Sequence, residues 1–312
     1  MMNPKTLLRE HLHRIWRDLS SVQNLIDEID FKVLSKDETS EIFFKTSKIV
    51  DSGELRVSGP DRIPDWESGW NEVLLEFEKN PTIQSLIPQY FGKHKYARLN
   101  SKFIGTNESE TELNFLRIVE TLVINEVMGL EYKNNLKIKN IYEFGCGTGH
   151  NLVYLATLFP ELNYFGLDWS TKSQQLLQSI KNSGLLTNLE CANFDFYNPD
   201  NNYQIGPRSI VITVATLEQM GSSHDRFVDY LLDQKPSYVI HIEPEQDFLD
   251  PENVVDQLSM RYSKNRGYLQ GLLTSLMELQ SKNELNILKA YRTGLGSYLL
   301  DGYSVIIWEP RI

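Results

Sequence analysis

The chain has 312 residues, of which 41% are hydrophobic and 23% are charged, and its formal net charge at pH 7 is −11. This composition predicts a folded protein with one large domain or two ordinary ones, and the acidic excess disfavours nucleic acid as a partner, because its phosphates bind clustered Lys and Arg. The two cysteines, Cys146 and Cys191, exclude a disulfide framework and a cysteine-rich zinc site, so a reducing cytoplasm is the expected location.

The first 135 residues are expected to form a mainly helical region that caps the rest of the chain and recognises a substrate. The N-terminus alternates apolar and charged residues at helical spacing, with Leu8, Leu12 and Ile15 on one face, and it lacks the apolar core of a secretory signal. The sequence has no apolar run of about 18 residues, so no membrane span is expected. Residues 111–130 predict a helix that packs on the C-terminal part of the chain.

The segment SGPDRIPDWESGW, residues 58–70, is expected to be an ordered loop, because flexible linkers seldom contain two tryptophans. Trp66 and Trp70 allow two interpretations. They stack on a sugar or another ring of a substrate, or they belong to the core, which is the commoner place for aromatic residues in an ordered loop.

From about residue 140, short apolar runs alternate with helical patterns. The apolar runs at 140–144, 163–168, 188–194, 209–215 and 237–243 are separated by segments with helical spacing. Strands that alternate with helices predict a Rossmann-like, doubly wound and mostly parallel sheet. A long helical region over 252–282 precedes two further apolar runs, which predict an antiparallel hairpin at the sheet edge. Residues 136–312 are therefore expected to form one domain with a seven-stranded sheet.

The segment YEFGCGTGHN, residues 142–151, joins the first of these strands to a helix. Its glycines, Gly145, Gly147 and Gly149, let the backbone bend and let a ligand approach without meeting a Cβ. A turn between a strand and a helix also uses glycine for purely structural reasons. The dinucleotide fingerprint needs GxGxxG, and here the sixth position is His150, which argues against a pyrophosphate ligand.

Two acidic residues come after the next strands. Asp168 lies 19 positions after Gly149, about where a carboxylate accepts hydrogen bonds from ribose hydroxyls, although it also suits a helix start capped by Ser170. Asp195 is a candidate for the amino group of an adenine, with Phe194 or Phe196 against the ring, or else forms a turn beside core aromatics.

These motifs together resemble those of the class I S-adenosylmethionine-dependent methyltransferases, and the resemblance covers about residues 139–312. It implies that S-adenosylmethionine is the cofactor and that a small molecule is the methyl acceptor. By this resemblance Glu143 and the glycines shape the methionine end of the pocket, Asp168 holds the ribose, and Asp195 with Phe196 holds the adenine. The remaining residues expected at the cofactor are Cys146, Asn151, Trp169 and Leu217.

Methyl transfer is an in-line displacement that needs an aligned nucleophile and, for a hydroxyl acceptor, a base. The candidates for catalysis are His241, Glu243 and Glu218, which lie at or just after the ends of the fourth and fifth strands. Strand alternation predicts that His241 and Glu243 share one face of the sheet. A hydrogen-bonded core histidine is the alternative for His241. No metal is expected.

The acceptor site is expected to include Glu245 and residues of the segment MRYSKNRGYLQG, namely Arg261, Tyr262 and Arg266. Arginines with tyrosines suit the phosphate or carboxylate of a bulky substrate such as a nucleotide-linked sugar, and an exposed helix face is the alternative. A sugar hydroxyl is the preferred acceptor. A small amine, a protein, and a cofactor-binding module without catalysis remain as alternatives, and the sequence does not predict the oligomeric state.

Overall fold

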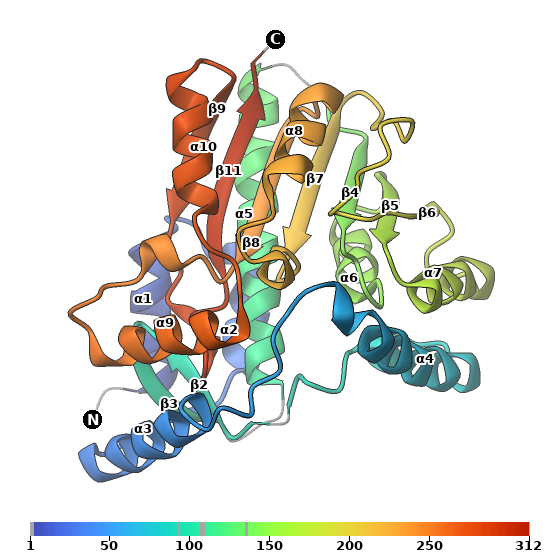
Figure 1. Cartoon of the computed structure of the whole chain (residues 1–312). Coiled ribbons are helices and arrows are strands. Elements are labelled where there is room, and N and C mark those ends of the chain that lie inside the picture. The colour runs from blue at the N-terminus through green and yellow to red at the C-terminus, as the bar shows by residue number, and fades with distance from the viewer. Residues whose placement is uncertain (1–2, 93, 107–109, 135–136, 312) are drawn as a thin grey trace.

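A seven-stranded sheet forms the centre of the protein, whose computed structural model describes residues 3–92, 94–106, 110–134 and 137–311 (Figure 1). The strand order is β6-β5-β4-β7-β8-β11-β9. The first five strands in this order are parallel, and β11 runs antiparallel to both β8 and β9. The strands are β4 (Asn140–Phe144), β5 (Asn163–Asp168), β6 (Leu189–Asn193), β7 (Ser209–Val214), β8 (Tyr238–Glu243), β9 (Leu285–Tyr291) and β11 (Ser304–Pro310). This sheet confirms the predicted fold class and its C-terminal hairpin.

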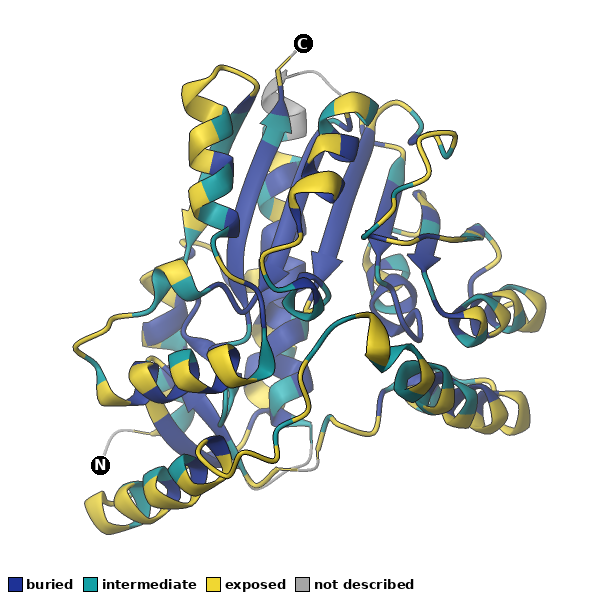
Figure 2. Cartoon of the chain, viewed as in Figure 1, coloured by how far each residue is buried: buried dark blue, intermediate teal, exposed yellow. Residues whose placement is uncertain are grey.

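Helices cover both faces of the central sheet, because its strands are apolar on both sides. Every residue of β7 and β8 is buried, and the outward faces of the helices are exposed (Figure 2). In β4, Ile141 belongs to the core on one face and Phe144 to the core on the other. The first core includes α5 (Thr111–Asn134), α6 (His150–Leu158) and α7 (Thr171–Ser183), and the second includes α8 (Asp225–Gln234) and α10 (Leu272–Ser281).

The helical region expected over 252–282 is two helices. α9 (Val254–Arg266) ends at Gly267, whose φ of 63° lies in the left-handed region that favours glycine. α10 begins after Gly271, which is also left-handed. The break turns α9 away from the central sheet, and α9 packs instead on α3 (Lys36–Val50).

A second, antiparallel sheet lies beside the first, and its strand order is β1-β3-β2-β10. Its strands are β1 (Phe31–Val33), β2 (Tyr96–Leu99), β3 (Lys102–Thr106) and β10 (Leu295–Ser297). The remaining helices of the N-terminal region are α1 (Pro4–His13), α2 (Gln23–Glu28) and α4 (Ile63–Lys79). β10 lies in the connection between β9 and β11, where the sequence predicted a short connection without a strand. The expected boundary at residue 135 therefore does not separate the sheets, because a C-terminal strand completes the N-terminal one.

Most of the segment expected as an ordered loop is helical, because Pro60–Arg62 form a 3-10 helix and the rest from Ile63 belongs to α4. α4 begins at Ile63, and Pro64 lies in its first turn, where a missing N–H costs no helical hydrogen bond. The helix carries Trp66 and Trp70 on one side, one turn apart. Their rings stack with centroids 5.4 Å apart. The two tryptophans that argued for an ordered segment thus belong to a helix.

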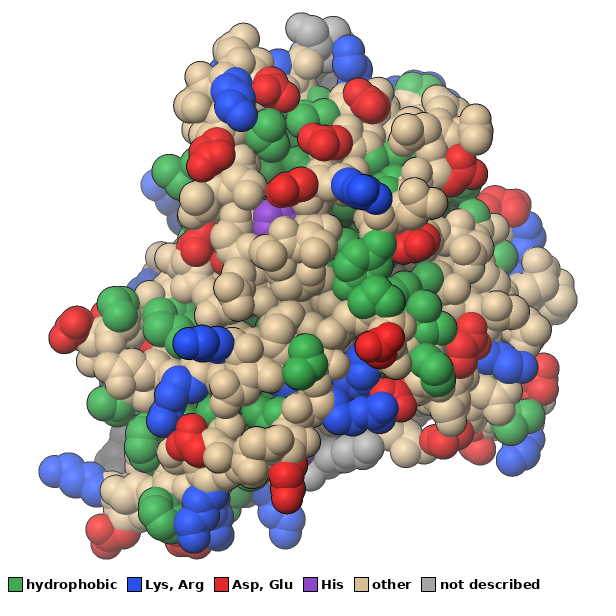
Figure 3. Space-filling model, viewed as in Figure 1, with side chains coloured by type: hydrophobic (Ala, Val, Ile, Leu, Met, Phe, Trp, Pro, Cys, Tyr) green, Lys and Arg blue, Asp and Glu red, His purple; other side chains and the backbone are tan. Residues whose placement is uncertain are grey.

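The surface carries charges of both signs. On the face shown in Figure 3, Lys and Arg side chains lie among Asp and Glu side chains rather than in one basic area. Within the described ranges, no helix is both long and apolar enough to cross a membrane.

A buried ion network holds the β9–β11 connection in place. Arg292, just after β9, donates to both oxygens of Asp256 in α9 at 2.7 and 2.8 Å, and to Asp301 at 2.6 Å. The side chains of Asp256 and Asp301 are 0% and 1% exposed. Arg98 of β2 is also fully buried, and it donates to the Tyr298 carbonyl oxygen at 3.1 Å. These contacts join α9, β2 and the connection that carries β10.

We expect Arg292→Met to lower the free energy of unfolding by about 3–5 kcal/mol, because it leaves two buried carboxylates without their cation. Urea denaturation measures this change. Arg261→Met is the control, since Arg261 pairs with Asp51 at 3.3 Å with both side chains about half exposed, and such pairs contribute less than about 1 kcal/mol. Equal unfolding midpoints for the two variants would contradict the role of the network.

Candidate functional site

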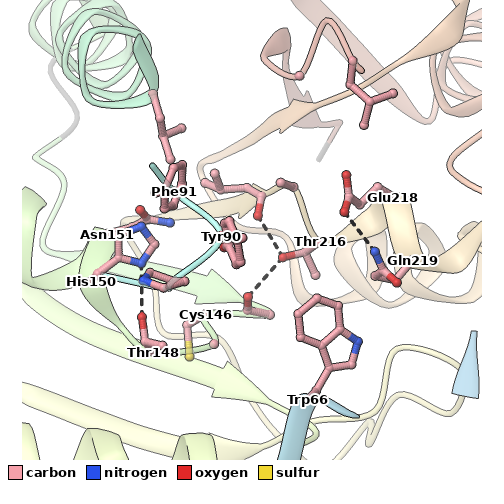
Figure 4. A pocket seen from close by; sticks show the side chains of 18 of the residues that line it. Trp66, Tyr90, Phe91, Cys146, Thr148, His150, Asn151, Thr216, Glu218 and Gln219 are labelled. Carbon is pink, nitrogen blue, oxygen red and sulfur yellow. Dashed lines mark hydrogen bonds between the residues drawn. The ribbon is translucent and has the colours of Figure 1, made fainter. Parts of the chain in front are cut away.

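A cavity of about 350 Å³ opens where the strands β4, β5 and β7 end (Figure 4). Its wall is built by the loops after these strands, by the N-terminal region and by the β9–β11 connection. The residues expected at the cofactor that line it are Glu143, Gly145, Cys146, Gly147, Asn151, Asp168, Trp169 and Phe196. Among the residues that the structure describes, no group of three or more His, Cys, Asp or Glu side chains is arranged to hold a metal ion.

The glycines after β4 are required by close packing as well as by backbone conformation. A Cβ on Gly145 would lie 2.0 Å from Thr216 Cγ2, and one on Gly147 would lie 2.9 Å from the ring of Trp70. Both glycines have positive φ. Gly149 does not line the cavity. A Cβ there would lie 2.5 Å from Leu177, so this glycine lets α6 approach α7 and has a packing role in place of the expected cofactor contact.

Asp168 joins the glycine loop to the start of α7. Its Oδ2 accepts from the Gly147 N–H at 2.9 Å, and its Oδ1 accepts from the Ser170 N–H at 2.8 Å. The side chain is 5% exposed, and burial raises the pKa of its carboxyl group to about 6, against the effect of the two N–H donors. The hydroxyl of Ser170 caps α7, so the helix-start interpretation holds while Asp168 also faces the cavity.

Glu143 places an unpaired oxygen at the cavity. Its Oε1 accepts from Asn151 Nδ2 at 2.7 Å, whereas its Oε2 is buried and has no hydrogen-bond partner in the described part of the chain. The side chain is 1% exposed, and burial raises the pKa of its carboxyl group to about 8. A buried acceptor without a donor is costly, so this oxygen is suited to a donor group of a ligand.

Two residues expected at the cofactor lie elsewhere. Asp195 is exposed, and its Oδ1 accepts from the Tyr197 N–H at 2.9 Å, which makes it a turn residue. Leu217 is fully buried in the core beneath α8. Neither side chain lines the cavity.

His241 has a core role in place of the predicted catalytic one. It is fully buried on the α8 and α10 side of the sheet, and it does not line the cavity. Its Nε2 accepts from Trp308 Nε1 at 3.0 Å, and its Nδ1 lies 2.9 Å from the hydroxyl of Thr213. Burial lowers the pKa of His241 to about 3, so the ring is neutral at pH 7 and has no path to a substrate proton.

Glu243 also lies outside the cavity, and it holds the loop after β7. Its Oε1 accepts from the N–H groups of Thr216 and Leu217, both at 3.1 Å, and its Oε2 accepts from the Glu218 N–H at 3.3 Å. Glu243 is thus a positioning residue for Thr216 and Glu218, which do line the cavity. Of the three predicted catalytic residues, Glu218 alone faces the cavity among the described lining residues.

Of the four residues expected at the acceptor site, one lines the cavity and three do not. Tyr262 lines the cavity, whereas Arg266 stacks over the rings of Tyr262 and Tyr268 at 5.8 and 4.8 Å. Arg261 is exposed on α9 and pairs with Asp51. Glu245 accepts from the Asp247 N–H at 3.2 Å and so caps a short 3-10 helix. Neither arginine nor Glu245 is in the described lining of the cavity.

The N-terminal region supplies further residues of the cavity wall. Figure 4 shows Trp66, Tyr90 and Phe91 around the same space as Cys146 and Thr216. Trp66 and Trp70, for which stacking on a substrate ring was one of two interpretations, both line the cavity. The other lining residues include His94, Glu112, Thr148, His150, Thr216, Gln219, Tyr268 and Tyr303. The one signal in the sequence was the spacing of Trp66 and Trp70, which places both on one side of a helix.

α4 is attached to the central domain through the start of α7. The carboxylate of Glu67 accepts from the N–H of Thr171 at 2.6 Å and from that of Lys172 at 3.0 Å. These N–H groups have no partner within α7, and the positive end of the helix dipole favours an anion there. Trp66 and Trp70 are thereby held against the glycine loop.

No protein-family model matches the chain, and no curated protein matches it. Solved structures do match it. One is an O-methyltransferase from neocarzinostatin biosynthesis in complex with S-adenosylmethionine and 2-hydroxy-5-methyl naphthoic acid, with 17% identity over 64% of this chain and 58% of that one, and a TM-score of 0.41. A second is magnesium protoporphyrin IX methyltransferase from Synechocystis PCC 6803 with bound S-adenosylmethionine, with 14% identity over 77% and 97% of the chains and a TM-score of 0.45.

A third match is human N-acetylserotonin methyltransferase in complex with S-adenosylmethionine, with 13% identity over 65% of this chain and 56% of that one, and a TM-score of 0.40. The chain thus spans less than two thirds of the length of the neocarzinostatin enzyme and of the human enzyme. At identities of 13% to 17%, the likeness is one of fold alone.

We expect His241→Ala to lower the free energy of unfolding by about 2–4 kcal/mol, because it opens a cavity and leaves the Trp308 N–H unpaired. Chemical denaturation monitored by tryptophan fluorescence measures the loss. His13→Ala is the control, since His13 is exposed near the end of α1 and its variant is expected to unfold like the wild type. A fully stable His241→Ala protein would refute the core role.

Proposed function

We propose that this protein is an S-adenosylmethionine-dependent methyltransferase that acts on a small molecule. The observation that carries the proposal is the cavity at the ends of β4 and β5, where a glycine-rich loop lies between Glu143, which has an unpaired oxygen, and the Asp168 carboxylate. The central sheet has seven mostly parallel strands and an antiparallel C-terminal pair at one edge, as expected from the sequence.

The residues present fit the cofactor at three places. Glu143 Oε2 would accept from the amino group of the methionine portion, because it is a buried acceptor without a donor. Asp168 would hold the ribose hydroxyls, since each of its oxygens accepts one N–H and keeps a free lone pair. Trp169 and Phe196 line the cavity and would lie against the adenine, a role that Asp195 is too far outside to share.

S-adenosylmethionine would supply an electrophilic methyl group on a sulfonium, and the protein's part is to orient the acceptor and exclude water. The aromatic wall from α4 and from the segment of Tyr90 and Phe91 suits water exclusion. Glu218 is the candidate for contact with the acceptor, because it faces the cavity from the loop that Glu243 holds.

The preferred acceptor from the sequence, a sugar or nucleotide-linked sugar hydroxyl, depended on Arg261 and Arg266. Neither guanidinium is in the described cavity wall, so these two arginines do not support an anionic portion of the substrate. The proposal of a small-molecule acceptor does not depend on these arginines, because it rests on a cavity of about 350 Å³ lined by side chains from several segments.

We expect Asp168→Ala to weaken S-adenosylmethionine binding by about 1.5–3 kcal/mol, roughly ten- to hundredfold in Kd, because charge-assisted hydrogen bonds to the ribose are lost. Isothermal titration calorimetry measures the change. Asp195→Ala is the matched control, since this carboxylate is exposed and outside the cavity, and its Kd is expected to stay at the wild-type value. An unchanged Kd for a folded Asp168→Ala protein would remove the ribose assignment.

Turnover is tested by incubating the purified protein with S-adenosylmethionine labelled in its methyl group and with fractionated extracts of its host. We expect the label to enter the small-molecule fraction, because the cavity is lined on several sides by side chains. Label in protein or RNA would exclude the small-molecule proposal. Tight cofactor binding without any transfer would indicate a binding module instead of an enzyme.

A further inference from the structure

A second group of cavity residues is not needed to hold the cofactor. It consists of two carboxylates, Glu112 at the start of α5 and Glu218 after β7, and of the phenol rings of Tyr90, Tyr262, Tyr268 and Tyr303. We refer to these six residues as the acidic aromatic wall. They come from segments distant in sequence, so the fold, rather than one local motif, brings them to the same cavity.

Glu218 of the acidic aromatic wall has a polar neighbour, Gln219, that also lines the cavity. Gln219 donates its Nε2–H to Glu218 Oε1 at 2.9 Å, as Figure 4 shows, and this leaves Gln219 Oε1 buried without a partner in the described chain. Burial raises the pKa values of Glu112 and Glu218, and the phenols of Tyr303 and Tyr268 act in the opposite direction on Glu112 and Glu218 respectively. An N–H group of a ligand would satisfy the unpaired Gln219 oxygen, which lies beside Glu218.

The charge of the cavity favours a cation. Four of the lining residues that the structure describes are acidic, and no Lys or Arg is among them. Glu143 and Asp168 are assigned to the cofactor, which leaves Glu112 and Glu218 to face an acceptor. The positive charges of Arg266 and Arg62 lower the pKa of Glu218 against the larger effect of burial, although neither arginine is in the described lining. Phenol rings attract ammonium groups through their faces, and the attraction grows where water is excluded.

We propose that the methyl acceptor is a small amine that enters as an ammonium ion and is held by Glu112 and Glu218 among the four tyrosines. The proposal rests on the proposed methyltransferase function and names its substrate class. It replaces the sugar hydroxyl with an acceptor whose charge is complementary to the acidic aromatic wall.

An ammonium nitrogen must lose a proton before its lone pair attacks a methyl carbon. A carboxylate of the acidic aromatic wall accepts that proton and later releases it to solvent. The nitrogen–carbon bond then forms as the carbon–sulfur bond breaks, the bonding pair stays on sulfur, and the positive charge passes to the methylated nitrogen. Burial, followed by the charge of Glu218, raises the pKa of Glu112 to about 7, and burial also raises that of Glu218 to about 7, so both groups are suited to take up a proton near neutral pH.

The test compares two probes of the same shape, benzylammonium and benzyl alcohol, for binding to the full chain saturated with S-adenosylhomocysteine. We expect benzylammonium to bind about tenfold more tightly or better, because the alcohol has no charge for the carboxylates. Equal or weaker binding of benzylammonium would overturn the proposal.

The double variant Glu112→Gln/Glu218→Gln keeps the shape of the wall and removes its charge. We expect it to lose most of the preference for benzylammonium while its affinity for S-adenosylhomocysteine stays near the wild-type value. Glu190→Gln is the control, since Glu190 pairs with Lys181 on the surface and its side chain is 66% exposed. An unchanged preference in the folded double variant would also overturn the proposal.

The affinity for S-adenosylhomocysteine, measured on the same samples, separates the two proposals. Cofactor binding without a preference for benzylammonium removes the amine acceptor and leaves the methyltransferase proposal in place. A preference for benzylammonium in a protein that does not bind the cofactor removes the methyltransferase proposal and reduces the acidic aromatic wall to a cation site.

Discussion

The carboxylate of Asp168 is the contact on which the rest of the site depends. It accepts from the N–H of Gly147 in the glycine loop and from that of Ser170 at the start of α7. The next N–H groups of α7 bind Glu67 of α4, and α4 in turn places Trp70 on Gly147. The glycine loop, α7 and α4 are thus each held by contacts with the other two. Each element is thereby oriented by two others, which is the preorganisation that a small-ligand site needs.

Local patterns predicted the sheet, the glycine loop and the position of Asp168, because strands, helices and tight turns have characteristic spacings in sequence. The roles of His241 and Asp195 were not predictable in this way. Strand alternation places His241 and Glu243 on one face, but it does not say whether that face meets the cavity or the helices behind the sheet. Asp195 has a motif position that suits adenine, yet its chain turns outward after β6.

The wall of the cavity was hidden from sequence analysis for a different reason. Tyr90, Glu112 and Tyr303 have no shared motif, because they meet only through long-range packing of the N-terminal region and the β9–β11 connection. β10 has three residues, too few for an alternation to be recognised. For Arg266 the sequence suggested a ligand contact that the structure replaces with an internal one. The basic and aromatic segment around it suggested a bound anion, whereas its guanidinium stacks on Tyr262 and Tyr268.

The pairing of Gly296 in β10 with Arg98 in β2 places a restriction on the order of events during synthesis. The N-terminal sheet lacks its last strand until β10 has left the ribosome, well after β1 to β3. Contacts so distant in sequence form slowly, because a long loop must close before they contribute any stability. β4 to β8 therefore leave the ribosome before β10, and the N-terminal sheet beside the cavity is completed after the strands at whose ends the cavity lies.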